Sequence, residues 1–190
     1  WLPSVGSARE ITFAGDRAND LRRAAHFNDA TGTAVTTAGV HSGDAYTVDT
    51  VIPVVPEDEQ LADQPFAPLK MPDQSGIPQA LTELASDATE DAETPIERAR
   101  ALEAYLQTDG YFSHGLADDV YSPSGHGAAR ITALVAGEQM VGDDEQYAVT
   151  MALMATQLGM PARVVMGWYP DEGEGDNGGV FTATGDNMHA

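Results

Sequence analysis

Asp144 and His189 carry side chains of types that can do acid–base chemistry, a carboxylate and an imidazole. A carboxylate that faces an imidazole can bind a ligand or transfer protons. Asp144 also has a structural interpretation, because an acidic side chain at the start of a helix caps it and complements its dipole, contributing about 1 kcal/mol. Both interpretations of Asp144 stay open: it is a cap or salt-bridge partner, or it keeps a polar role toward an imidazole.

Other reactive patterns are missing from the sequence. The 190 residues contain no cysteine, which excludes disulfides, thiolate metal sites and a cysteine nucleophile within them. The acidic loop 171–177 lacks the regular ligand positions and the closing bidentate glutamate of a calcium site. The remaining histidines, which show no ligand spacing such as His-x-x-x-His, are His26, His41, His114 and His126. We therefore predict no metal site and no cofactor.

Composition and charge limit the classes of partner. The chain is 42% hydrophobic, enough to bury a core, and its 9 basic and 30 acidic residues give a formal net charge of −21. This charge repels phosphate backbones and anionic lipid, so nucleic acid is not an expected partner. No signal peptide is visible, and the most apolar stretch, 148–168, is too interrupted by polar residues to be a membrane span.

A helix and two strands are predicted between residues 145 and 184. Residues 145–158 carry apolar side chains on every face, which predicts a buried helix. Gly159 and Pro161 are typical of a helix end. The Val-rich run 162–169 then predicts a buried strand, and residues 180–184 predict another.

The chain upstream divides into a β-rich element at 1–55, a proline-rich linker at 56–75 and a core at 76–190. In the first, alternation predicts a strand at 8–13, and richness in Thr and Val predicts strands at 32–37 and 45–54. Asp16 is the expected N-cap of a helix over 16–26. In the core, helices are predicted at 77–88, 94–106 and 128–135. The core is expected to be truncated at its C-terminal end, as in a piece of a longer protein.

The helix at 94–106 has the clearest local start signal in the chain. Thr94 and Glu97 have the spacing of a capping box, and Pro95 stands at the first helical position, where its missing N–H costs nothing.

Three runs resemble the core of bacterial transglutaminase-like domains, strongly over 142–167 and moderately from Thr94 onward. They are Gly142-Asp143-Asp144-Glu145-Gln146-Tyr147-Ala148, Leu158-Gly159-Met160-Pro161-Ala162-Arg163-Val164 and Met188-His189-Ala190. The family has Gly-x-Cys-Glu-Gln-(Phe/Tyr)-Ala, Leu-Gly-Ile-Pro-Ala-Arg-Val and His-Ala-Trp in the same order. The resemblance implies an α+β, papain-like core, in which a buried helix carrying Asp144 packs on an antiparallel sheet carrying His189.

The chain departs from this family where the family has its catalytic cysteine, because Asp144 stands there. The resemblance implies that His189 is the catalytic histidine and faces Asp144 across the cleft. It also implies that the third catalytic residue, an aspartate, follows Ala190. Residues expected to line or support the cleft are Glu145, Gln146, Tyr147 and Trp168. A carboxylate is a far weaker nucleophile than a thiolate, so neither transglutaminase nor cysteine-protease activity is expected.

The resemblance is to the membrane-anchored branch of the family, whose transglutaminase-like domain is extracytoplasmic. It implies a catalytically degenerate ectodomain of a cell-envelope protein, with a binding or scaffold role toward peptide or envelope polymer. The alternative is a hydrolase of changed chemistry that uses Asp144 and His189 as an acid–base pair.

Overall fold

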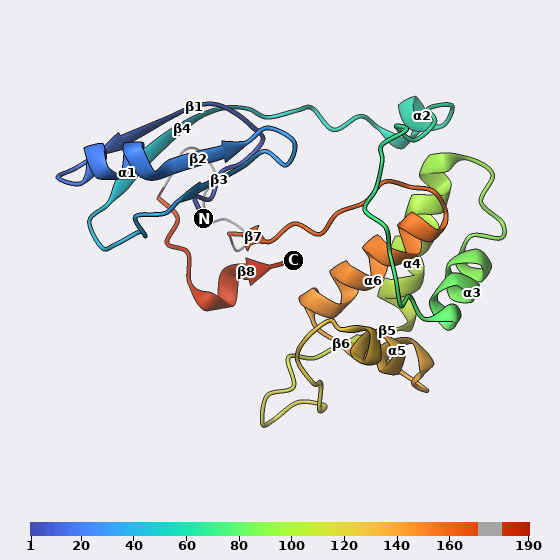
Figure 1. Ribbon diagram of the computed structural model, residues 1–190. Helices are drawn as coiled ribbons and strands as arrows, with labels where there is room; N and C mark the ends of the chain where they lie inside the picture. Colours follow the sequence, from blue (N-terminus) through green and yellow to red (C-terminus); the bar gives the residue numbers. More distant parts are fainter. Residues whose placement is uncertain (171–179) are drawn as a thin grey trace. The chain divides into compact units, whose positions relative to one another are not determined.

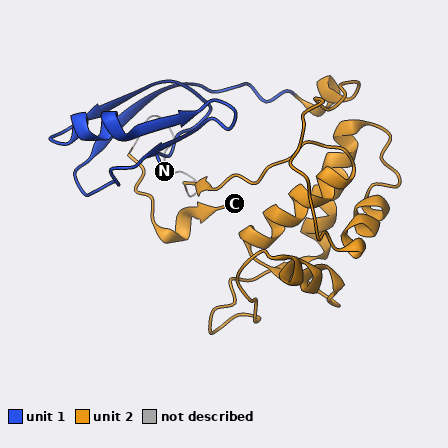
Figure 2. Ribbon diagram, in the orientation of Figure 1, with its two compact units in different colours: residues 1–56 blue, residues 57–190 orange. Residues whose placement is uncertain are grey.

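The computed structural model describes residues 1–170 and 180–190. The chain forms two compact units, residues 1–56 and 57–190 (Figure 2). Helices and small sheets are mixed along the chain, in agreement with the α+β prediction.

The first unit is a small β-rich element. Strand β1 (Ser7–Ala14) pairs antiparallel with β4 (Ala45–Val51), and β2 (Ala25–Asn28) pairs antiparallel with β3 (Thr33–Thr36). Helix α1 (Ala18–Ala24) follows β1 along the chain. The buried side chains that hold this unit together are Leu2, Phe13, Leu21 and Ala34.

Two predictions for this unit need correction. The helix predicted over 16–26 begins after Arg17, not after Asp16, and ends before Ala25. Arg17 is held by hydrogen bonds to the Asp44 carboxylate (2.6 Å) and the Ala38 carbonyl (3.1 Å), and Ala25–Asn28 is drawn into β2 by pairing with β3. The strand predicted to reach residue 54 stops at Val51, which is paired with the first residue of β1.

The second unit is built mainly of helices (Figure 1). These are α2 (Asp58–Leu61), α3 (Gln79–Ala88), α4 (Pro95–Asp109), α5 (Ala128–Ala136) and α6 (Asp144–Gln157). Its core contains fully buried side chains from α3, α4, α5 and α6, among them Leu81, Leu102, Ile131 and Met154. The capping box and first-turn proline predicted at the start of α4 are both present.

A short parallel strand pair leads into α6. Strand β5 (Gly110–Phe112) pairs with β6 (Met140–Gly142), and α6 begins two residues after β6. No residue of α6 is exposed, as its apolar faces predicted. Its neighbours include α3, α4 and α5. The papain-like packing of this helix on an antiparallel sheet remains a prediction.

The strand predictions after α6 were largely wrong. Only Gly167–Trp168 of the run 162–169 forms a strand, β7, which pairs antiparallel with β8 (Met188–His189). Val165, Met166 and Trp168 are exposed, and residues 180–184 form no strand. A buried strand needs neighbours along its edges and cover on its faces, and β7 has a described partner for two residues only.

Thr150 supplies a stability prediction from within this core. Its side chain is fully buried on α6, and its hydroxyl oxygen has no hydrogen-bond partner among the described residues. Because an unpaired buried hydroxyl costs free energy, Thr150→Val should raise the free energy of unfolding by about 1 kcal/mol. Urea denaturation followed by circular dichroism measures this change. The control is Thr132→Val, which removes a hydroxyl that donates to the Ala128 carbonyl and should not raise the free energy of unfolding.

Candidate functional site at the start of helix α6

The start of α6 is capped by Asp143. Its carboxylate accepts hydrogen bonds from the backbone N–H groups of Glu145 (3.0 Å) and Gln146 (3.4 Å), and the Gln146 side-chain oxygen accepts from the Asp143 N–H (2.9 Å). This is a complete capping box. The capping role considered for Asp144 therefore belongs to its neighbour, and the Asp144 carboxylate is left for another contact.

That contact is with His189. The Nδ1 atom of His189 lies 3.2 Å from Oδ2 of Asp144. Asp144 is the first residue of α6 and is partly buried, whereas His189 is exposed at the end of β8. The second unit thus brings together the two side chains that the sequence singled out, from positions far apart in the chain.

Glu145 has a separate histidine partner that sequence reasoning missed. Its carboxylate lies 2.5 Å from Nδ1 of His126 and accepts a hydrogen bond from the Gly125 N–H (3.2 Å). The hydrogen bond with His126 holds the pKa of Glu145 below its usual range, against the opposing effect of burial. Spacing in the sequence carried no signal for this pair, because loop and helix meet only on folding.

The other predicted site residues are Gln146, Tyr147 and Trp168. The buried Gln146 amide completes the capping box and donates to the Gly125 carbonyl (2.9 Å). The Tyr147 hydroxyl lies 2.6 Å from the Met140 carbonyl oxygen and 3.2 Å from that of Tyr111, between β5 and β6, and burial raises its pKa. Trp168 is exposed on β7 opposite Met188, beside the register position of His189.

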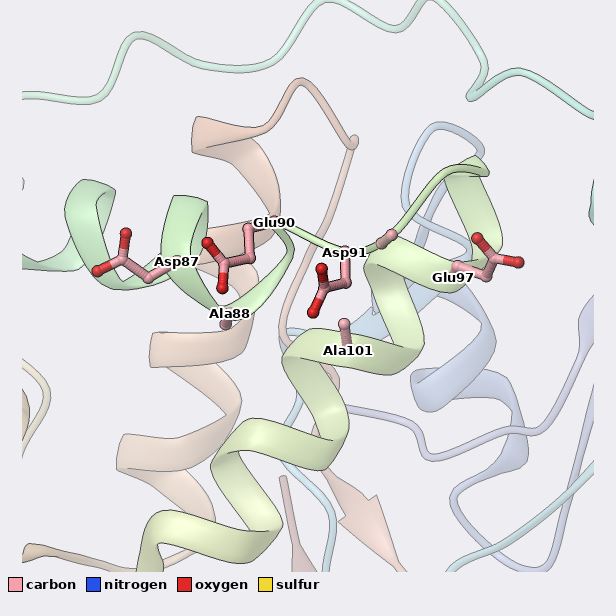
Figure 3. Close-up of a pocket in the computed structure, with 7 residues that line it drawn as sticks. Asp87, Ala88, Glu90, Asp91, Glu97 and Ala101 are labelled. Atoms are coloured by element: carbon pink, nitrogen blue, oxygen red, sulfur yellow. The ribbon is translucent and has the colours of Figure 1, made fainter.

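Two surface hollows lie elsewhere on the second unit. One, of about 280 Å³, contains an acidic set at the end of α3 and the start of α4 (Figure 3): Asp87, Glu90, Asp91 and Glu97. The other, of about 330 Å³, lies between residues 69–74 and the end of α6. Neither is lined by Asp144 or His189. Glu97 of the acidic hollow is already engaged in the capping box of α4.

No three histidine or acidic side chains in residues 1–170 and 180–190 are grouped as metal ligands. The acidic loop 171–177, whose sequence lacks the pattern of a calcium site, lies outside the described residues.

The Asp144–His189 arrangement has a defined chemical capacity. A carboxylate at Nδ1 favours the imidazole tautomer that carries its proton there, which leaves Nε2 to accept a proton. Such a pair can orient a polar ligand or act as a general base toward water. Neither residue, nor any other in the chain, supplies a thiol.

The Glu145 contact predicts an acid-dependent contribution to stability. A carboxyl whose pKa is lower in the folded state stabilises that state above its unfolded pKa, and this contribution is lost as the pH falls through the folded pKa. Glu145→Gln should therefore lower the free energy of unfolding at pH 7 by less than about 1 kcal/mol, since the group is partly exposed. The difference in the free energy of unfolding between Glu145→Gln and the unmodified chain should vanish in acid, below the folded pKa of Glu145. Urea titrations at several pH values test this. A difference that stays constant with pH would contradict the prediction.

Comparison with protein families gives one match. The model described as the transglutaminase-like superfamily matches residues 82–190, which is more than half of the chain and includes both Asp144 and His189. No curated protein and no solved structure matched the chain. Among the helices that the structure describes, none has the length and apolar character needed to cross a membrane.

Proposed function

Because the chain belongs to the transglutaminase-like superfamily, we propose that it is a catalytically degenerate member with a binding or scaffold role. Asp144 stands where the family's nucleophilic cysteine is expected, directly before Glu145-Gln146-Tyr147. The proposal is carried by the contact between His189 and Asp144, 3.2 Å between Nδ1 and Oδ2, at the leading end of the buried helix α6.

The chemistry of the substitution supports loss of the family's reaction. Acyl transfer from an amide needs a polarizable thiolate, whose pKa is lowered by a helix N-terminus and a histidine. A carboxylate is ionised at neutral pH but weakly nucleophilic, and its attack on an amide would pass through a high-energy anhydride. The dipole of α6 is complementary to a negative charge at its first residue, where Asp144 stands.

The binding role takes peptide or a cell-envelope polymer as its ligand. With Nδ1 donating to Asp144, the exposed imidazole offers an acceptor at Nε2, and the carboxylate offers further acceptor sites, to polar groups of such chains. We also propose that the parent protein is membrane-anchored and that this region is extracytoplasmic. The absence of cysteine and the formal charge of −21 are compatible with an oxidising, salty exterior.

A hydrolase of changed chemistry is the second candidate, and the same contact favours it. With Nδ1 directed at Asp144, Nε2 of His189 could take a proton from water that attacks an ester or amide. In this reaction the water oxygen bonds to the carbonyl carbon, and the bond from that carbon to the leaving oxygen or nitrogen breaks. The leaving alcohol or amine receives the proton from Nε2. Such a reaction needs an open pocket around the pair.

A substrate screen separates the two candidates. Amide and ester substrates are incubated with the unmodified chain, with Asp144→Ala and with the control Asp63→Ala, which changes an exposed carboxylate away from the site. The degenerate assignment predicts equal background rates for all three. Turnover that falls at least about tenfold in Asp144→Ala alone would establish the hydrolase instead.

A further inference from the structure

The loop from Ser113 to Ser122, here the 113–122 loop, is internally bonded. The buried Ser113 hydroxyl donates to the Val120 carbonyl and accepts from the Gly115 N–H (2.9 Å). A turn closes from the Asp119 N–H to the Leu116 carbonyl (3.0 Å). Gly115 has φ +68°, and a Cβ there would stand 2.4 Å from the Ser122 carbonyl oxygen, so the loop closes tightly on itself.

Both ends of the 113–122 loop are tied to the chain around β6 and α6. At its start, the Ser113 N–H donates to the Gly142 carbonyl (2.8 Å). At its end, Arg130 donates to the Ser122 hydroxyl (3.2 Å) and to the Val141 carbonyl (2.7 Å). The loop backbone is therefore held in place by the fold.

This ordered loop nevertheless exposes large apolar side chains. Leu116 is 69% exposed and Tyr121 is 79% exposed, and Val120 between them is exposed too. None of the three belongs to the core of the second unit. The loop is ordered by its own hydrogen bonds and presents apolar side chains outward. It would therefore lose less conformational entropy on binding a partner than a flexible loop would.

The loop also carries negative charge among these side chains. Asp118 and Asp119 are both exposed and lie in sequence between Leu116 and Val120. Together with the net charge of −21, they disfavour anionic lipid and nucleic acid and favour a cationic partner. The mixture of acidic and apolar groups is complementary to a polypeptide that carries both basic and apolar side chains.

We propose that the 113–122 loop is an interaction surface for a polypeptide segment that carries both apolar residues and lysine or arginine. The apolar side chains of the partner would pack on Leu116, Val120 and Tyr121, and its cations would face Asp118 and Asp119. This surface uses neither Asp144 nor His189, so it goes beyond the proposed function and does not depend on it.

Binding of labelled short peptides tests the proposal by fluorescence anisotropy at physiological ionic strength. The probes are a Lys/Leu peptide, a Glu/Leu peptide and a Lys/Ser peptide of equal length. The Lys/Leu peptide should bind most tightly, and Leu116→Ser with Tyr121→Ser should weaken it about tenfold. The matched control is Leu69→Ser, at a leucine that is 66% exposed in the proline-rich segment, and it should leave the affinity unchanged.

Three results would overturn the proposal. Equal binding of the Lys/Ser peptide would reduce the effect to general attraction by an acidic chain. An equal loss in Leu69→Ser would show that any exposed leucine serves. Sedimentation with phosphatidylcholine vesicles that depends on Leu116 and Tyr121, without binding of the Lys/Leu peptide, would assign the loop to a lipid surface. Circular dichroism of each variant verifies that the fold is retained.

Discussion

Asp144→Cys should carry a thiol whose alkylation profile has its midpoint at least about one pH unit below the ordinary thiol pKa of about 8.5. Two features of the site lower the pKa of such a thiol. It would stand at the first residue of α6, where the helix dipole stabilises an anion, and beside His189, whose Nδ1 now lies 3.2 Å from the carboxylate. Since the chain has no cysteine, the introduced thiol would be the only one.

The measurement is the rate of iodoacetamide alkylation against pH, followed by mass spectrometry. Ser86→Cys is the control, because Ser86 is exposed near the end of α3, where the helix dipole disfavours an anion. Adding His189→Ala to Asp144→Cys should move the midpoint back toward the ordinary value. An ordinary midpoint that does not respond to His189→Ala would remove the basis for placing Asp144 at the family's nucleophile position.

This experiment also separates loss of the nucleophile from loss of the site. A depressed midpoint would mean that the surroundings of residue 144 still favour an anionic nucleophile, so that one substitution accounts for the missing chemistry. The loss of catalysis proposed for the natural chain would then be caused by the aspartate at position 144 alone. The substrate screen with Asp144→Ala addresses the natural chain itself.

Met154→Ala should lower the free energy of unfolding by about 2–5 kcal/mol. Met154 is 0% exposed and lies on α6 within the core that also contains Leu81 and Leu102. Truncation removes buried apolar surface and leaves a cavity that the surrounding helices can fill only in part. Because α6 also positions Asp144, the contact with His189 should weaken as the core loosens.

The matched control is Met166→Ala, at a methionine that is 64% exposed, where the expected change is within about 0.5 kcal/mol. Urea denaturation monitored by helical circular dichroism measures both variants. Equal effects of the two substitutions would contradict the placement of α6 at the centre of the helical core.

Local signals in the sequence determined most of the helices. Thr94, Pro95 and Glu97 specify the start of α4 through contacts within one turn of the chain, and the structure has them. The apolar faces of residues 145–158 likewise required burial all round, whatever surrounds them. The family match over 82–190 agrees with the motifs that flank this helix.

Helix register and long-range pairing were decided only by the tertiary structure. Asp143 and Asp144 are adjacent and chemically identical, so composition could not say which one caps α6 and which one contacts His189. The His126–Glu145 pair joins a loop to a helix, and its spacing follows no local period. The Val-rich run 162–169 has the composition of a strand, but strands form only where a partner strand supplies hydrogen bonds. Among the described residues its partner is β8, which is two residues long.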